Sequence, residues 1–268
     1  MAKIARVSHL QEFKDSGRKF SCLTSYDQFT AEIFDEAGIS VLLVGDSAAE
    51  NALAHESVLA ITVDEIIPLG RAVAKAASRA LVVVDMPFGS YEAEPADALR
   101  NAIKIMKETG AAAVKLEGGR RSAEKISAIV TAGIPVMGHI GFTPQSVHAL
   151  GGFKVQGRGE DAAEEVMAEA LAVQEAGAFA VVLELVPSDL AAKITDALSI
   201  PTIGIGAGAA TDGLILGWTD FAGLTTGKSR KFVRQYANLR DQLLSATKQY
   251  VSDVESGSFP NESESFSD

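Results

Sequence analysis

Short apolar runs alternate with amphipathic helical stretches along most of this chain. Runs of four or five residues rich in Val, Leu and Ala are typical of strands buried in a parallel sheet. We expect strands at residues 20–24, 41–44, 81–84, 113–116, 135–138, 180–183, 202–205 and 221–224. We expect helices at residues 28–37, 63–77, 95–109, 122–132, 161–176 and 188–197. Several of these stretches end in a glycine just before the next strand, which is a common signal for the end of a helix.

This alternation predicts an α/β fold, and eight βα units in 268 residues match a single-domain (β/α)8 TIM barrel in length and order. A doubly wound open sheet is the structural alternative, but no break divides the chain into two halves. We assign residues 1–255 to the barrel domain, with an N-terminal segment and a closing helix at residues 231–252. Residues 256–268 are rich in Ser and Glu, so we expect a flexible tail or an arm on a neighbouring subunit.

The charge of the chain restricts its partners, and its cysteine content and lack of long apolar stretches restrict its location. A formal net charge of −11 argues against nucleic acid and anionic membranes as partners. The single cysteine, Cys22, allows neither a disulfide framework nor a thiolate zinc site. No long apolar stretch suggests a membrane span, and the first residues lack the apolar core of a secretory signal. We therefore expect a cytoplasmic protein.

Acidic residues lie at the carboxyl ends of several expected strands, which is where α/β barrels build their active sites. Asp46, Asp85 and Glu117 follow the second, third and fourth strands, which are neighbours in a parallel barrel. Like charges so close to one another remain ionised only if a cation joins them, and carboxylate oxygens suit Mg²⁺. The alternative is that each acid separately caps a helix or forms a loop salt bridge. Three adjacent acids favour a metal site formed by Asp46, Asp85 and Glu117.

Three further residues are candidates for catalysis. Lys115 lies two residues before Glu117 on the same strand, so both side chains point into the barrel if either does. It would either stabilise an enolate oxygen or serve as a buried partner for an acid. Glu184 ends the sixth strand and would act as a general base, or else form a structural ion pair. His139 ends the fifth strand, where a catalytic role and a structural role are equally compatible with the sequence.

Two connections are longer than packing requires, at residues 47–61 and 141–160. The second contains five glycines together with Lys154 and Arg158. Long loops at the catalytic face of a barrel often act as lids or as walls of the substrate site. We expect such a role for the second loop, whereas the first is equally compatible with a surface excursion.

The sequence resembles the ketopantoate hydroxymethyltransferase (3-methyl-2-oxobutanoate hydroxymethyltransferase) family from about Thr24 to Phe266. The resemblance rests on eight motifs in one order: TSYD at 24–27, VGDS at 44–47, DMPFGSY at 85–91, VKLEGG at 114–119, GHIGFTPQS at 138–146, GGFKVQGR at 151–158, ELVP at 184–187 and IGIGAG at 203–208. It implies a (β/α)8 barrel of the phosphoenolpyruvate/pyruvate type.

The resemblance also implies an activity: Mg²⁺-dependent transfer of a hydroxymethyl group from 5,10-methylenetetrahydrofolate to 3-methyl-2-oxobutanoate. The product would be 2-dehydropantoate, in the first step of pantothenate biosynthesis. By motif, the metal would be held by Asp46, Asp85 and Glu117, and Glu184 would be the proton acceptor. The keto acid would contact Asp46, Ser47, Asp85 and Lys115, and His139 is a further candidate for that contact. The resemblance further implies a homo-oligomer, commonly a decamer in this family, and no residue pattern marks the folate site.

Residues 54–62 and 218–231 depart from the family pattern, but these departures remove none of the catalytic candidates. Two alternatives to the transferase remain. One is a Mg²⁺-dependent carbon–carbon lyase of the phosphoenolpyruvate mutase and isocitrate lyase type, which usually carries a reactive cysteine in a lid. In this chain Cys22 lies on the first expected strand instead. The other is a non-catalytic ligand-binding barrel, which would not need a base opposite the metal.

Overall fold

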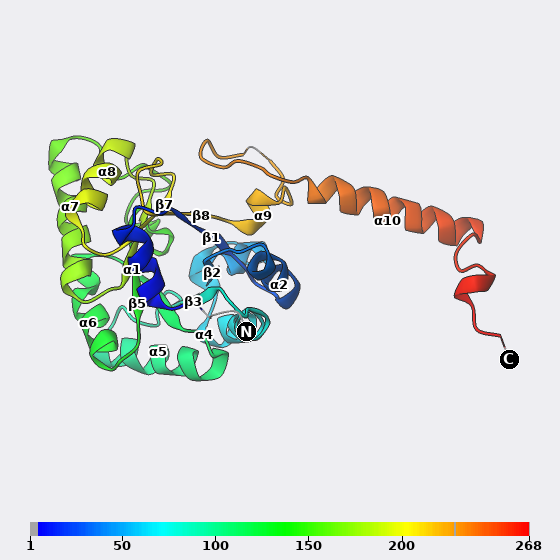
Figure 1. The fold of residues 1–268 in the computed structure, drawn as a ribbon, viewed down its shortest axis with the longest axis horizontal. Helices are drawn as coiled ribbons and strands as arrows, with labels where there is room; N and C mark the ends of the chain where they lie inside the picture. The colour runs from blue at the N-terminus through cyan, green and yellow to red at the C-terminus, as the bar shows by residue number, and fades with distance from the viewer. Residues whose placement is uncertain (1–4, 228, 268) are drawn as a thin grey trace. The chain divides into compact units, whose positions relative to one another are not determined.

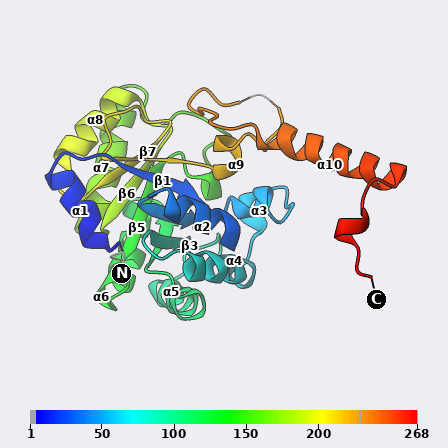
Figure 2. The same cartoon turned by 45° about the vertical axis from the view of Figure 1, so that its right-hand side comes forward.

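A computed structural model describes residues 5–227 and 229–267 of the protein. The chain forms two compact units, of which the first ends at Gly217 and the second begins at Trp218. Within the described residues, the first unit contains eight parallel strands that close into a barrel in sequence order, from β1 to β8 (Figures 1 and 2). The predicted (β/α)8 barrel is therefore confirmed.

The strands are β1 (Phe20–Thr24), β2 (Val41–Val44), β3 (Leu81–Asp85), β4 (Ala113–Glu117), β5 (Val136–Gly141), β6 (Ala180–Glu184), β7 (Thr202–Ile205) and β8 (Gly213–Leu216). The longer helices of this unit are α1 (Val7–Asp15), α2 (Gln28–Glu36), α4 (Val63–Ala76), α5 (Pro95–Thr109), α6 (Ala123–Thr131), α7 (Glu160–Glu175) and α8 (Ser188–Ala197). Figure 1 shows α5, α6, α7 and α8 on the outside of the strands. Two of the helices, α5 and α8, have the bounds expected from the sequence.

Every second residue along each strand points into the barrel and fills its interior. The inward set forms one buried apolar cluster: Phe20, Cys22, Val41, Leu43, Leu81, Val83, Ala113, Met137, Ala180, Val182, Ile203 and Ile215. Because side chains two apart in a strand share a face, the next inward positions of β3, β4, β5 and β6 are Asp85, Lys115, His139 and Glu184. The candidate site therefore lies directly above the apolar core, at the carboxyl ends of the strands.

The outward face of β5 is closely packed against α7. A Cβ atom at Gly138 would lie 2.4 Å from Cγ1 of Val173, so only glycine fits at this point of β5. This contact brings α7 close to the strand that carries His139.

The eighth strand differs from the prediction. Residues 221–224 were expected to form it, but β8 is Gly213–Leu216, which pairs with β1 and β7. Residues 206–212 connect β7 to β8 through bends and irregular backbone rather than a helix. The expected strand was placed too late because a regular βα repeat requires a helix between consecutive strands.

The second unit contains the short helix α9 (Trp218–Phe221), the helix α10 (Leu239–Ser256) and a 3-10 turn at Glu262–Glu264. The closing helix was predicted to start at residue 231, but the backbone N–H groups of Tyr236 and Leu239 donate to the carbonyls of Phe221 and Ala222. Residues 231–238 are therefore a connection, and the predicted start is wrong. Lys228, within the segment 218–231 that departs from the family pattern, lies outside the described residues.

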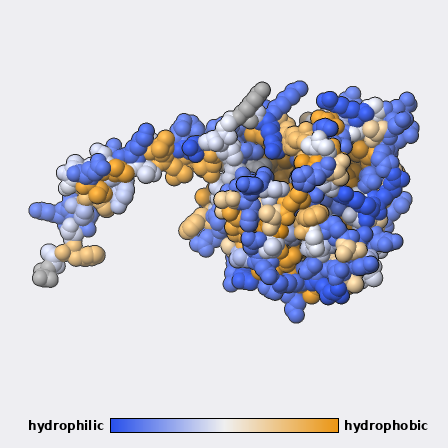
Figure 3. Space-filling view, turned by 180° about the vertical axis from the view of Figure 1, so that it is seen from behind, coloured by the Kyte–Doolittle hydropathy of each residue, from blue (hydrophilic) through white to orange (hydrophobic). Residues whose placement is uncertain are grey.

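Helix α10 has no buried residue, and Figure 3 shows apolar side chains exposed beside polar ones along the C-terminal segment. Beyond it, the ring of Phe259 makes an edge contact with Tyr250 at a centroid distance of 5.7 Å. The extent of the barrel domain to residue 255 and the flexibility of residues 256–268 stay predictions. Among the helices that the structure describes, none has the length and apolar character needed to cross a bilayer.

Candidate active site

The six charged candidates from the sequence surround the mouth of the barrel. Asp85, Glu117 and Glu184 are the last residues of β3, β4 and β6, and Asp46 follows β2 after one glycine. Lys115 and His139 lie within β4 and β5. All six are buried; Glu184 is the most exposed of them, at 8%. Since a buried charge is costly without a partner, each of these groups must be matched by another within the site.

Lys115 is paired directly with Asp85. The two residues are opposite each other in the β3–β4 register, and the Lys115 Nζ atom lies 2.8 Å from Asp85 Oδ1. The other oxygen of Asp85, Oδ2, accepts a hydrogen bond of 2.9 Å from the backbone N–H of Asp46. Burial lowers the pKa of Lys115, but attraction to Asp85, Glu117 and Asp46 outweighs it and raises that pKa above its usual value. Lys115 is therefore a permanent cation in this site.

His139 lies between two carboxylates. Its Nδ1 atom is 3.3 Å from Glu117 Oε1, and its Nε2 atom is 3.2 Å from Glu184 Oε2. Burial and the Lys115 ammonium, 3.2 Å from Nδ1, lower the pKa of His139. The two carboxylates outweigh both effects, so the pKa of His139 is raised from its usual value to about 9. The same pairing with His139 helps to hold the pKa of Glu117 below its usual value despite burial. Glu184 is thus joined through His139 to the acid cluster.

The site holds more acidic than basic side chains. Four carboxyl groups, Asp46, Asp85, Glu117 and Glu184, are buried there with two basic groups, Lys115 and His139. Burial, together with repulsion from Asp85 and Glu117, raises the pKa of Asp46 to about 8. Burial likewise raises the pKa of Asp85, although Lys115 opposes that shift. A divalent cation would offset this excess.

The donor set of this cluster fits Mg²⁺ in its chemistry, because three carboxyl groups, Asp46, Asp85 and Glu117, follow or end neighbouring strands and are buried together. Across the described residues, however, no three acidic, histidine or cysteine side chains are close enough together to form a ready-made ligand shell. The metal site at Asp46, Asp85 and Glu117 therefore stays a prediction. The roles of Ser47 and His139 in substrate binding also stay predictions.

Ser47, at the start of the short helix α3 (Ala48–Asn51), is hydrogen bonded to the Tyr26 hydroxyl at 2.7 Å. Tyr26 is buried, and burial raises the pKa of its hydroxyl. The TSYD motif thus supplies a group that fixes the orientation of the Ser47 side chain. No role for Tyr26 was predicted from the sequence.

Two more residues join the site without having been predicted. Gln145, in the 3-10 turn Pro144–Ser146, contacts both Asp46 and Glu117. Tyr91, in the loop after β3, contacts Gln145 and the backbone of Glu117. Both lie within the quoted motifs, but the sequence does not show which way a loop residue points.

The loops that contain these residues have some regular structure. Residues 47–61 include α3 and a 3-10 turn at Val58–Ala60, and residues 141–160 begin with the turn that carries Gln145. Gly141 has a φ of 86°, and an added Cβ would lie 2.3 Å from the carbonyl oxygen of Glu184. The backbone N–H of Phe142 donates to that same carbonyl at 2.8 Å, so the start of the second loop fixes the end of β6.

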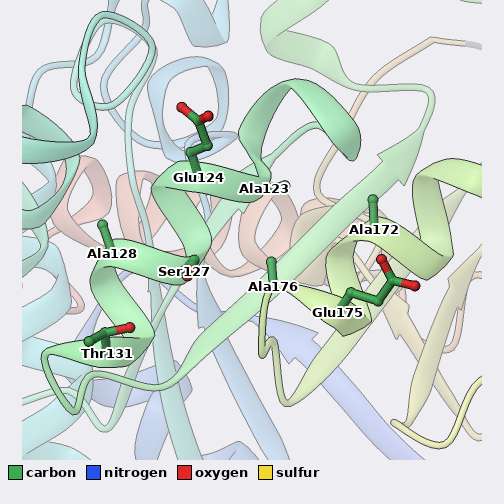
Figure 4. A pocket seen from close by; sticks show the side chains of 8 residues that line it. All are labelled: Ala123, Glu124, Ser127, Ala128, Thr131, Ala172, Glu175 and Ala176. Atoms are coloured by element: carbon green, nitrogen blue, oxygen red, sulfur yellow. The ribbon is translucent and has the colours of Figure 1, made fainter.

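Two other features lie apart from this site. A surface hollow of about 590 Å³ between α6 and α7 is lined by small residues with Glu124 and Glu175 at its edges, and by none of the six charged candidates (Figure 4). Cys22 is 3% exposed within the barrel core, and burial raises the pKa of its thiol. A thiol in that position is not the reactive lid cysteine that a lyase of the alternative type would need.

Comparison with known proteins agrees with this arrangement. The sequence family described as ketopantoate hydroxymethyltransferase matches residues 5–262. A 3-methyl-2-oxobutanoate hydroxymethyltransferase of Leifsonia xyli subsp. xyli is 61% identical over 98% of this chain and 95% of its own length. One from Corynebacterium efficiens is 58% identical over 99% of this chain and 98% of its own length.

Solved structures give the same fold at low identity. A phosphonopyruvate hydrolase in complex with oxalate and Mg²⁺ has a TM-score of 0.62 and 13% identity, covering 97% of this chain and 93% of that one. A 2,3-dimethylmalate lyase, a member of the PEP mutase/isocitrate lyase superfamily, has a TM-score of 0.60 and 14% identity, covering 99% of this chain and 93% of that one. These likenesses support the barrel fold and not a shared activity.

Proposed function

The chain belongs to the ketopantoate hydroxymethyltransferase family and is a hydroxymethyltransferase, and from this premise we propose that it converts 3-methyl-2-oxobutanoate to 2-dehydropantoate. The one-carbon donor in this proposal is 5,10-methylenetetrahydrofolate, and the metal is Mg²⁺. The reaction would be the first step of pantothenate biosynthesis, carried out in the cytoplasm. The observation that carries the proposal is the buried cluster of Asp46, Asp85, Lys115, Glu117, His139 and Glu184 at the barrel mouth.

Asp46, Asp85 and Glu117 would hold the metal, since their oxygens suit Mg²⁺ and the cluster has more acidic than basic side chains. When bound, Mg²⁺ supplies a Lewis acid that withdraws electrons from the 2-oxo group of the substrate. Asp46, Ser47, Asp85, Lys115 and His139 would contact the keto acid. The Tyr26 hydroxyl would hold Ser47 in place for that contact.

The chain's own side chains account for the movement of the proton. Glu184 would remove the proton from C3 of the keto acid, and contact with His139 Nε2 holds its carboxylate in one orientation. The Lys115 ammonium would lie near the oxygen on which negative charge develops, and so would stabilise the enolate. The enolate carbon would then bond to the methylene carbon of the folate donor. Both C–N bonds of that carbon would break, water would supply the oxygen of the new hydroxymethyl group, and tetrahydrofolate would leave.

Proton NMR of 3-methyl-2-oxobutanoate in D₂O tests this proposal. With enzyme and Mg²⁺ we expect the C3 proton signal to be lost by exchange, and a chelator should prevent the loss. Addition of 5,10-methylenetetrahydrofolate should produce a hydroxymethyl resonance. If neither signal changes, the keto acid is not the substrate. Exchange without a hydroxymethyl product would instead contradict the folate donor.

Replacing Glu184 by Gln tests the base. The amide cannot accept the C3 proton, so we expect exchange and turnover to fall by about 10²- to 10⁴-fold, whereas binding of the keto acid persists. Glu175→Gln is a matched control, because Glu175 is exposed on α7 outside the site. An E184Q enzyme that binds poorly but turns over normally would exclude Glu184 as the base.

A further inference from the structure

Gln145 has every polar atom of its side chain engaged inside the carboxylate cluster. It is 6% exposed, and its Nε2 atom donates to Asp46 Oδ2 at 2.9 Å and to the carbonyl oxygen of Met86 at 3.0 Å. Its Oε1 atom is hydrogen bonded to the Tyr91 hydroxyl. A buried amide that satisfies all these partners has a fixed orientation.

The direction of this hydrogen-bond chain follows from its ends. The backbone N–H of Glu117 can only donate, so the Tyr91 oxygen accepts from it at 3.2 Å, and the Tyr91 hydroxyl hydrogen is then directed to Gln145 Oε1. At the other end, the carbonyl of Met86 can only accept, which identifies the amide nitrogen of Gln145. Asp46 Oδ2 therefore receives a hydrogen from Gln145 and acts as an acceptor.

Gln145 also holds a second acid through its backbone. Its N–H donates to Glu117 Oε2 at 3.0 Å, so one residue restrains a carboxylate oxygen of both Asp46 and Glu117. These acids stand at the ends of β2 and β4, on either side of Asp85 at the end of β3. Without such donors, repulsion among the three carboxylates would favour rotation of their side chains away from one another.

We propose that Gln145 is a positioning residue that fixes the carboxylates of Asp46 and Glu117 for the metal ion. This inference rests on the proposed metal site and adds a residue that no sequence pattern assigned. Groups that hydrogen bond to metal ligands orient them, and loss of such a group typically weakens metal binding by about 10- to 100-fold. The role of Gln145 is thus exerted through Asp46 and Glu117 rather than by contact with the substrate.

The test is the affinity of the full-length protein for Mn²⁺, measured by calorimetry without substrate. Gln145→Met keeps the length of the side chain and removes its amide, so we expect the Kd for Mn²⁺ to rise about 10- to 100-fold. Gln174→Met is the matched control, because Gln174 bonds to Ser199 and Ile200 away from the site and should leave the Kd unchanged. Circular dichroism and thermal unfolding would establish that both variants are folded.

Two further variants complete the experiment. Tyr91→Phe removes the hydroxyl but keeps the bond from Gln145 to Asp46, so its Kd should rise less than that of Q145M. If Q145M does not fold, Gln145→Asn serves instead, because its shorter amide does not reach Asp46 and should weaken Mn²⁺ binding in the same direction. A folded Q145M or Q145N with the wild-type Kd would overturn the role of Gln145 alone. A wild-type protein that does not bind Mn²⁺ would overturn the proposed metal site as well.

Discussion

At the scale of single residues, the Lys115 ammonium offsets only part of the charge around it. It pairs with Asp85 at 2.8 Å and lies 3.2 Å from His139, which is itself paired with Glu117 and Glu184. A fixed cation in a buried site interacts strongly with any charge that develops nearby, because little water is present to screen it. The pairing of Lys115 with Asp85 can therefore be separated from its proposed role, which is stabilisation of an enolate.

Lys115→Met separates the two effects. Without the ammonium, we expect turnover to fall by about 10²- to 10³-fold, the scale typical for loss of one group that stabilises a developing oxyanion. Affinity for Mn²⁺ should not fall, since removal of a cation beside Asp85 leaves the cluster more negative. Steady-state kinetics and Mn²⁺ titration measure the two quantities. Lys104→Met, which alters an exposed pair with Asp64, is the control, and normal turnover by K115M would exclude Lys115 from catalysis.

The strand residues of the site could be predicted from the sequence, but the loop residues could not. Lys115 and Glu117 are two apart on one strand, and the same spacing continues inward to Ala113 in the core, so strand periodicity alone directs both side chains to the barrel mouth. Gln145 and Tyr91 reach the site from loops, where no periodicity relates position to direction. The contact of His139 with Glu184 depends on side-chain rotamers, which the spacing of residues also leaves open.

At the scale of elements, Asp35 joins the end of α2 to the segment between α4 and β3. Its carboxylate accepts hydrogen bonds from the backbone N–H groups of Ser78, Arg79 and Ala80 and from the Ser78 hydroxyl. Burial raises the pKa of Asp35, but these bonds outweigh it and hold that pKa below its usual 3.8. A carboxylate satisfied by several N–H groups stabilises the connection that leads into β3.

Asp35→Asn should destabilise the protein by about 2 to 3 kcal/mol at pH 7, because the amide turns a donor toward backbone N–H groups that then lack an acceptor. The folded-state pKa of Asp35 lies below its value in the unfolded chain, so its contribution is complete above about pH 4 and is lost as pH falls through the folded pKa. Urea unfolding at a series of pH values should show the difference between wild type and D35N shrinking on acidification. Glu108→Gln, an exposed change, should have little effect, and a pH-independent difference for D35N would contradict this account.

Local sequence signals explain why some elements were predicted well and others were not. Helix α5 begins at Pro95 and ends before Gly110, whose φ is 78°, so local signals mark both of its ends. The strand β8 has no such signals, and its place depends on pairing with β1, a contact between residues almost 200 positions apart in the sequence. Local chemistry therefore predicts helix bounds, whereas the closure of the barrel is determined by tertiary contacts.

At the scale of the whole molecule, one face of α10 is apolar and exposed. Leu243, Tyr250 and Val254 are 58%, 57% and 47% exposed, and their spacing of seven and four residues places them on one side of the helix together with Val251. Exposed apolar stripes of this length usually mark a surface that another protein covers. We propose that a second copy of this chain covers it, in agreement with the homo-oligomer that the family resemblance implies.

Light scattering of the full-length protein tests this proposal. We expect a mass that is a multiple of 28.1 kDa, and a decamer if the family pattern holds. The double variant Leu243→Lys and Tyr250→Lys places two charges on the apolar stripe, so the mass should fall, because burying unpaired charges in an interface is costly. Ser245→Lys with Ser252→Lys adds the same charges to the other side of the helix and should preserve the mass. A monomeric wild type, or equal masses for wild type and the L243K/Y250K variant, would show that this stripe is not the contact between copies.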